Sequence, residues 1–221
     1  MKAPLKIALL GAESTGKTTL TQQMAQHLGD RGHRVAVVGE VLREWCAREG
    51  RTPRPEEQLP IAQEQERRVD EAAASADIVI TDTTAIMVAV YSAMLFEDGS
   101  LYQFAQERQR RYDLTLLTGL DIEWVPDGLQ RDGPHVRGPV DAQVRQALSQ
   151  AGVGWRMVYG QGAERVRCAL EAVAAVAPWA WSAAASVEDA QRWARLKSTC
   201  EKCGDAQCEH RLFTRLTAPP T

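Results

Sequence analysis

The sequence has 221 residues, of which 44% are hydrophobic and 25% are charged, and its formal net charge at pH 7 is −3. This composition argues against a disordered chain and against a strongly basic protein that binds nucleic acid. Because there is no run of about 18 apolar residues and no leader pattern at the N-terminus, we expect a cytoplasmic protein with one main domain and no membrane partner.

The first strand is predicted at residues 7–10, where an apolar run ends at Gly11. Such a run is typical of a parallel strand that is covered on both faces. Residues 18–28 follow as a helix, because Leu20, Met24 and Leu28 recur at every fourth position. A second apolar run at 34–40 completes a strand–helix–strand unit, which predicts a parallel sheet.

The rest of the chain continues this alternation. Helices are predicted at 41–51 and 56–76, a strand at 77–84, and one or two helices within 85–112 that break at the sequence EDGS. Further strands are expected at 112–120 and 155–160, and further helices at 140–152 and 163–177. About five strands alternating with helices predict a three-layer α/β/α sandwich with a parallel sheet.

The composition changes after Pro178 to alanine, serine and tryptophan, and a cysteine-rich segment follows. We therefore expect a domain at 1–178 and a C-terminal tail at 179–221. Four soft ligands lie close together in this small Cys/His-rich appendage and would suit a structural Zn²⁺ ion: Cys200, Cys203, Cys208 and His210. Reduced thiols without metal are the alternative.

A phosphate-binding motif, GxxxxGK[ST], begins at the end of the first predicted strand. Its spacing lets backbone N–H groups curl around phosphates, while the lysine reaches the terminal phosphates and the Ser/Thr hydroxyl binds Mg²⁺. No base-reading NKxD element of a GTPase is present, so a small ATP-dependent kinase is favoured. The residues expected to bind ATP are Gly11, Glu13, Ser14, Thr15, Gly16, Lys17, Thr18 and Thr19.

Two carboxylates lie at the carboxyl ends of predicted strands, where the ligands of such a sheet converge. Glu40, with Arg43 one helical turn later, is placed to take a proton from an attacking hydroxyl. Asp82 is placed to hold Mg²⁺ together with Thr18, and Thr83 could donate a hydrogen bond to a ligand. The alternatives are a helix-capping acid at Glu40 and a surface aspartate at the start of a turn.

The segment 121–139 mixes charges, prolines and aromatics without periodicity, and it is predicted to be an ordered loop or lid. Trp124 lies between Asp121 and Asp127, a combination that suits a planar cation through stacking and charge. Arg131 and Arg137 could stabilise charge on a transferring phosphoryl group. A core tryptophan beneath a solvated loop is the alternative interpretation.

Five stretches together resemble the kinase domain of the NadR-type ribosylnicotinamide kinases over roughly residues 5–175. They are GAESTGKTTL, VGEVLREW, VITDTT, YDLTLLTGLDIEWVPDGLQRDG and MVYGQGAERVRCAL. The resemblance implies a P-loop kinase fold and transfer of the γ-phosphate of ATP to the 5′-hydroxyl of nicotinamide riboside, which gives nicotinamide mononucleotide and ADP. It also implies that Lys17 and Thr18 contact phosphate and Mg²⁺, and that Glu40 or Asp82 is the catalytic base.

The same resemblance implies that Trp124 and Asp127 hold the nucleoside, that Arg131 closes over the phosphates as a catalytic residue, and that Arg165 lies near the adenine. Fused members carry a DNA-binding domain and a nucleotidyltransferase domain before the kinase, so only the kinase activity is carried over. Two alternatives stay open: a kinase of another nucleoside or small-molecule acceptor, and an ATP-binding regulatory ATPase whose tail contacts a protein partner. The sequence does not indicate an oligomeric state.

Overall fold

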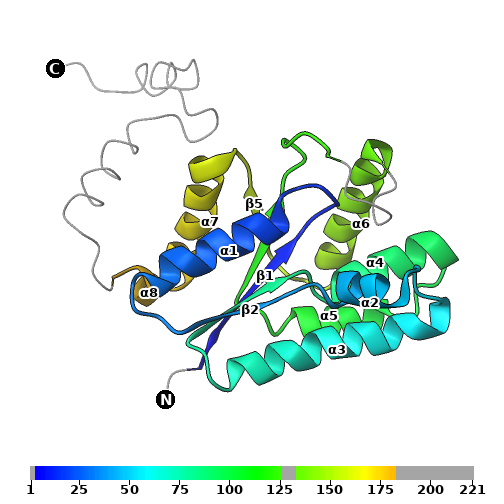
Figure 1. Cartoon of the computed structure of the whole chain (residues 1–221), viewed down its shortest axis with the longest axis horizontal. Coiled ribbons are helices and arrows are strands. Elements are labelled where there is room, and N and C mark those ends of the chain that lie inside the picture. The colour runs from blue at the N-terminus through cyan, green and yellow to red at the C-terminus, as the bar shows by residue number, and fades with distance from the viewer. Residues whose placement is uncertain (1–2, 126–132, 183–221) are drawn as a thin grey trace. The chain divides into compact units, whose positions relative to one another are not determined.

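The computed structural model describes residues 3–125 and 133–182 of the chain, and the described residues form an α/β sandwich around one parallel sheet (Figure 1). The strand order is β2-β3-β1-β4-β5. The elements, in chain order, are β1 (Leu5–Leu10), α1 (Lys17–Gly29), β2 (Val35–Val38), α2 (Val41–Glu49), α3 (Pro55–Ala73), β3 (Ile78–Asp82), α4 (Ala85–Phe96), α5 (Tyr102–Gln109), β4 (Leu114–Thr118), the 3₁₀ helix η2 (Pro134–Val136), α6 (Arg137–Gln150), β5 (Arg156–Val158), α7 (Gly162–Val176) and α8 (Pro178–Ser182).

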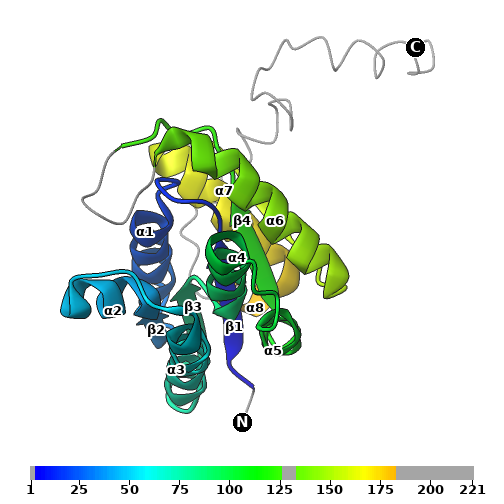
Figure 2. The same ribbon diagram turned by 90° about the vertical axis from the view of Figure 1, so that its right-hand side faces the viewer.

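Both faces of the sheet are covered by helices, as the continuous apolar strands predict. Successive side chains of β1 enter different clusters: Ile7 and Leu9 pack with α1 and α7, whereas Leu10 packs with α4 and α6. The two views show the same division, with α1, α7 and α8 on one face and α3 to α6 on the other (Figures 1 and 2). The predicted three-layer sandwich with five parallel strands is therefore confirmed for the described residues.

The register of the strands brings their carboxyl ends together. Leu9 on β1 is level with Asp82 on β3, and Leu10 is level with Leu117 on β4. The loop after β1, the turn after β3 and the end of β4 therefore meet at one edge of the sheet, where ligands of open α/β folds bind.

Several predicted elements are shorter in the structure. The second strand ends at Val38, because Gly39 and Glu40 turn into α2, and the fifth strand has only three residues. The helix α8 was not predicted, since its alanine and tryptophan composition has no clear periodicity. Ala180 in this helix is fully buried, and its carbonyl lies 2.9 Å from His33 Nε2.

The predicted division at 178/179 stays a prediction, since most of the tail lies outside the described residues. The same holds for the four proposed zinc ligands, Cys200, Cys203, Cys208 and His210. Among the described helices, none has both the length and the apolar composition needed to cross a membrane.

Candidate active site

The loop between β1 and α1 has the backbone conformation that a phosphate-binding loop requires. Gly11 and Gly16 have φ angles of 145° and 72°, in the range that favours glycine. A Cβ atom at Gly11 would also overlap the Thr118 hydroxyl at the end of β4, so a side chain is excluded there by space as well as by conformation. Helix α1 begins directly at Lys17, and its first N–H groups are available for an anion.

Contacts from distant parts of the chain brace this loop. The Thr15 hydroxyl donates to the Ala12 carbonyl at 2.8 Å and lies 2.7 Å from the Thr118 hydroxyl. The Arg165 guanidinium, on α7, donates to the Thr15 carbonyl at 2.8 Å. Because backbone and side-chain groups hold the loop before any ligand arrives, little ordering is needed when phosphate binds.

Arg165 is only 4% exposed, and it also contacts Asp121 Oδ1 at 3.2 Å and the Gly160 carbonyl at 3.0 Å. It therefore ties α7 to both the phosphate loop and the start of the segment after β4. Its predicted position near the adenine stays a prediction.

The Lys17 ammonium group folds over the loop, where it donates to the Gly11 and Ala12 carbonyls at 2.9 Å each. Its positive charge lies beside the N-terminus of α1, which carries the positive end of the helix dipole. The combination of an ammonium group and the N-terminal amides of a helix favours a negatively charged group at this point.

Asp82 and Thr18 form a pair of oxygen donors at the start of α1. The Thr18 hydroxyl donates to Asp82 Oδ2, which links the phosphate loop to the end of β3. Asp82 is 4% exposed, and its other oxygen, Oδ1, is buried without a hydrogen-bond partner among the described residues. A hydroxyl and an unsatisfied carboxylate oxygen fit Mg²⁺, which prefers hard oxygen ligands and completes its shell with water and phosphate.

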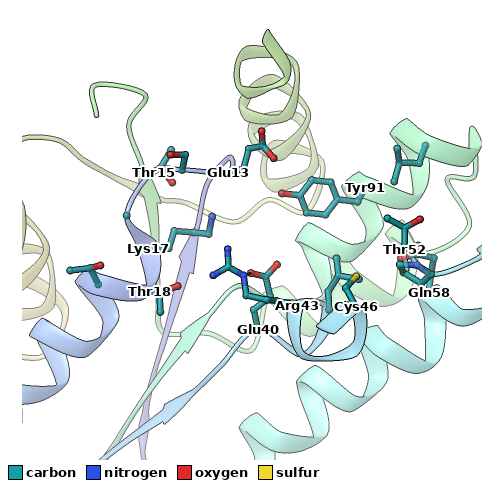
Figure 3. Close-up of a pocket in the computed structure, with 16 residues that line it drawn as sticks. Glu13, Thr15, Lys17, Thr18, Glu40, Arg43, Cys46, Thr52, Gln58 and Tyr91 are labelled. Carbon is teal, nitrogen blue, oxygen red and sulfur yellow. Dashed lines mark ion pairs between the residues drawn. The ribbon is translucent and has the colours of Figure 1, made fainter. Parts of the chain in front are cut away.

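A cavity of about 380 Å³ opens beside the loop (Figure 3). Residues 13–19 form one wall, so all of the central residues of the phosphate loop face it. The opposite wall comes from α2, α3, α4 and the connection between α2 and α3, through Glu40, Leu42, Arg43, Cys46, Thr52, Pro53, Gln58, Tyr91 and Leu95. The cavity therefore joins a phosphate-binding wall to a mixed polar and apolar wall.

Glu40 lies in this cavity, at the residue before α2. Its side chain makes no capping hydrogen bond to the helix, so the alternative interpretation of a capping acid does not describe it. Arg43 Nε lies 4.0 Å from Glu40 Oε2. In Figure 3 the side chains of Glu40, Arg43 and Lys17 extend toward the same part of the cavity, which brings a carboxylate to the phosphate-binding wall.

Gln65 holds the backbone on both sides of Glu40, and sequence reasoning did not find it. Its Oε1 accepts from the Val41 N–H at 2.9 Å, while its Nε2 donates to the Gly39 carbonyl at 3.1 Å and to Thr81 Oγ1 at 3.0 Å. The available signal was a glutamine at a position of α3 whose neighbours at spacing four, Ile61 and Val69, are apolar.

Glu66, the next residue of α3, holds the start of α4 in a similar way. Its buried carboxylate accepts from the Ala85 N–H at 3.0 Å and from the Tyr112 hydroxyl at 3.1 Å. Burial, and then the neighbouring Glu66 carboxylate, raises the pKa of Tyr112 well above its usual value, so this phenol stays a hydrogen-bond donor. Helix α4, which carries Tyr91 into the cavity, is thus fixed to α3.

Trp124 lies beside the phosphate loop, as the hypothesis of a stacking residue requires. Its Nε1 donates to Glu13 Oε1 at 3.3 Å, and the same oxygen accepts from the Gly133 N–H at 3.2 Å. The indole is half-buried, but the described residues that line the cavity do not include it. Its contact with an acceptor therefore stays a prediction, and Asp127 and Arg131 lie outside the described residues.

Thr83 is buried directly after β3 and does not belong to the described lining of the cavity. Its φ angle of 73° is unusual for a β-branched residue, and its N–H donates to the Leu9 carbonyl at 2.9 Å. This strained turn fixes the backbone next to Asp82. The predicted hydrogen bond from Thr83 to a ligand stays a prediction.

Cys46 is a half-buried cysteine in the α2 wall, and sequence reasoning gave it no role. Burial, followed by the nearby Glu40 carboxylate, raises the pKa of its thiol. At neutral pH the thiol is therefore protonated and contributes a small apolar surface to the cavity.

A family model described as an AAA domain matches residues 6–165 of the chain. None of the curated proteins matches the sequence. Two solved structures have a similar fold: NadR protein in complex with NR (TM-score 0.65, 19% identity, 78% of this chain and 50% of that chain covered), and NadR protein in complex with NAD and AMP-PNP (TM-score 0.64, 19% identity, 79% and 50% covered).

The aligned region thus spans about half the length of each of these NadR chains. At this level of identity the similarity establishes the fold, and the resemblance predicted from the sequence motifs is confirmed to that extent.

Proposed function

The chain belongs to the AAA domain family, and from this premise we propose that it is an ATP-dependent kinase that phosphorylates the 5′-hydroxyl of nicotinamide riboside. The products would be nicotinamide mononucleotide and ADP. The observation that carries this proposal is a cavity in which the phosphate loop faces Glu40, Arg43 and a wall of α2, α3 and α4 residues. A phosphoryl donor and a small acceptor can meet in such a cavity without crossing solvent.

In this mechanism the phosphate loop holds the β- and γ-phosphates of ATP. Its backbone amides and the Lys17 ammonium group neutralise the negative charge that the phosphoryl group carries during transfer. Mg²⁺, held through Thr18 and Asp82, would supply further charge stabilisation at the phosphates. Residues 1–178 would form the kinase module.

Glu40 acts as the general base in the proposal, since it lies in the cavity wall opposite the loop. It accepts the proton of the acceptor hydroxyl as the new P–O bond forms and the bond to the leaving ADP breaks. Arg43 lies beside this carboxylate, with its Nε 4.0 Å from Glu40 Oε2. Arg131 is assigned to charge stabilisation over the phosphates, and Asp127 and Trp124 to the nucleoside, by the sequence resemblance.

Support for the acceptor comes from the two NadR neighbours, one crystallised with NR and the other with NAD and AMP-PNP. The cavity wall opposite the phosphate loop contains an aromatic ring, Tyr91, and the apolar side chains of Leu42 and Leu95, which suit a planar ring. Another nucleoside with a free 5′-hydroxyl is the second candidate acceptor, because these wall residues do not by themselves require a pyridinium ring.

The test is a measurement of ADP formation from ATP and Mg²⁺ with nicotinamide riboside, adenosine, uridine or no acceptor. We expect ADP and a phosphorylated nucleoside in equal amounts with nicotinamide riboside, and slow ADP formation without an acceptor. Turnover with another nucleoside alone would replace the acceptor in the proposal. ATP binding with no acceptor-dependent turnover would instead support a regulatory ATPase.

A further inference from the structure

Gln58 is a buried polar residue of the cavity wall. The residue is 1% exposed, and it lines the cavity from the first turn of α3. Its Oε1 is shielded from solvent and has no hydrogen-bond partner among the described residues. A buried amide that gives up water without gaining a partner is destabilising, so such a group in a native fold calls for an explanation.

Two other glutamines of the core show what is usual in this fold. Gln65 is 1% exposed, and its amide makes the three hydrogen bonds around Glu40. Gln109 is fully buried, and its amide accepts from the Thr84 hydroxyl at 2.7 Å and donates to Thr115 at 2.9 Å. Gln58 is as deeply buried as these two, and it differs from them by facing the cavity.

The surroundings of Gln58 suit a flat, largely apolar group with one polar edge. In Figure 3 Gln58 and Thr52 lie on the side of the cavity away from Lys17, with Cys46 and Tyr91 between. Leu42, Pro53 and Leu95 also line the cavity and add apolar surface to it. A molecule that places its hydroxyl near the phosphate loop would therefore extend its ring toward Gln58.

We propose that Gln58 is a specificity residue for the planar ring of the nucleoside substrate. Its amide pairs with an edge of that ring on which a hydrogen-bond donor lies next to a hydrogen-bond acceptor. A primary carboxamide has such an edge, and so does the amino edge of adenine. The inference rests on the proposed kinase function and makes it more specific. Gln58 would recognise the polar edge of the substrate's ring at the end of the cavity away from the phosphates.

The chemistry of the amide explains the discrimination. A glutamine can turn its last bond and offer its oxygen to a donor and its nitrogen to an acceptor at the same time. A carboxylate has no donor, so the Gln58 oxygen would face another oxygen and stay unpaired. The site therefore favours nicotinamide riboside over the corresponding nicotinic acid riboside, and over a ring with no substituent.

The experiment is a double-mutant cycle between protein and substrate. The Gln58 amide and the carboxamide of the riboside are removed separately and together. Wild-type protein and Gln58→Leu are each assayed for kcat/KM with nicotinamide riboside and with the riboside of unsubstituted pyridinium, which lacks the carboxamide. Gln63→Leu is the matched control, because Gln63 is exposed on the same helix. The thermal midpoint of each variant is measured alongside.

We expect Gln58→Leu to lower kcat/KM for nicotinamide riboside at least about tenfold, through KM, with the thermal midpoint unchanged or raised, because an unpaired polar group is removed. The unsubstituted riboside should react equally with both proteins, so the two truncations would not add. Gln63→Leu should behave as wild type.

If the two losses add, or if Gln58→Leu leaves nicotinamide riboside kinetics unchanged while the wild type phosphorylates it, the inference fails and the proposed kinase function stands. If wild-type protein phosphorylates neither riboside, the cycle is repeated with adenosine and with purine riboside, which lacks the amino group. Coupling there supports the Gln58 inference although nicotinamide riboside is not the acceptor. No nucleoside turnover overturns both proposals.

Discussion

The two walls of the cavity differ in how the chain builds them. The phosphate wall is one continuous stretch, residues 13–19, and contacts from Thr118 and Arg165 brace the loop from behind. The opposite wall, where we propose that the acceptor binds, is assembled from α2, α3 and α4, and it includes an amide oxygen, on Gln58, that has no partner in the described part of the chain. In the proposed kinase, a short motif thus defines the donor side, whereas tertiary packing defines the acceptor side.

This difference has a physical reason. Every ATP-dependent enzyme with such a loop must bind the same polyphosphate, so backbone geometry and one lysine suffice there. An acceptor is recognised by shape and by a few polar groups, which different folds of the same class place differently. If the two walls have separate roles, substitutions in each wall should affect different kinetic constants.

The largest effect is expected at Lys17. Lys17→Ala removes the ammonium group that would contact the phosphates in the proposal, and we expect kcat to fall roughly 10²–10³-fold, the usual loss for one preorganised charge-stabilising donor. Lys6→Ala is the control, since Lys6 belongs to β1 but pairs with Asp70, away from the loop. If the Lys17→Ala variant kept a near-normal kcat, Lys17 would not stabilise the transferred phosphoryl group.

The second-largest effect is expected at Asp82. Asp82→Asn keeps the hydrogen bond from Thr18 but loses the negative charge, so activity at a fixed low Mg²⁺ concentration should fall about 10–100-fold and recover in part at high Mg²⁺. Titration of activity against Mg²⁺ checks this. Asp30→Asn, an exposed aspartate after α1, serves as the control. An unchanged Mg²⁺ dependence would contradict the metal role.

Trp124 tests whether a third region contributes to the acceptor wall. If its ring stacks on the nucleoside, Trp124→Ala raises the nucleoside KM about tenfold and leaves the ATP KM nearly unchanged. Trp124→Phe keeps an aromatic ring but loses the N–H that donates to Glu13. Equal increases in both KM values, shared by the phenylalanine variant, would mean that Trp124 acts through the phosphate loop instead.

The smallest effect concerns Cys46. Because its thiol pKa is raised, the thiolate fraction at pH 8 is below that of a cysteine in the unfolded chain, and alkylation by iodoacetamide should be several times slower. The rate should increase as the pH rises through the shifted pKa. Peptide mass mapping isolates this residue, and a bound acceptor should slow the reaction further. Alkylation as fast as in denaturant would contradict the burial of the thiol.

Much of the fold could be predicted from the sequence because the strands are continuous apolar runs that end at glycine or aspartate. β1 and β3 are examples, and their burial on both faces follows from that pattern. Element ends were less predictable: α8 packs through Trp179 against His33, with ring centroids 5.4 Å apart, and no local pattern indicates this contact.

The site was predictable only where it is local in sequence. The phosphate loop follows from its spacing, and Glu40 and Asp82 follow from their positions after strands. Thr118 braces Thr15 from 103 positions away, and such pairs carry no signal in a single sequence. Gln58 and Tyr91 were missed as wall residues for the same reason, since only the packing of α3 and α4 brings them together.

Helix α3 supplies three polar side chains around the cavity: Gln58 lines it, Gln65 holds the start of α2 and Glu66 holds the start of α4. Gln58 and Gln65 are seven positions apart, about two turns, and Glu66 follows at once. A single inserted residue between 58 and 65 would rotate the Gln58 amide by about 100° relative to the two helix-start contacts and move it about 1.5 Å along the axis. The number of residues between 58 and 65 therefore sets the position of the Gln58 amide relative to the starts of α2 and α4. A change in the length of this stretch would alter which ring the cavity accepts, without any substitution of a lining residue.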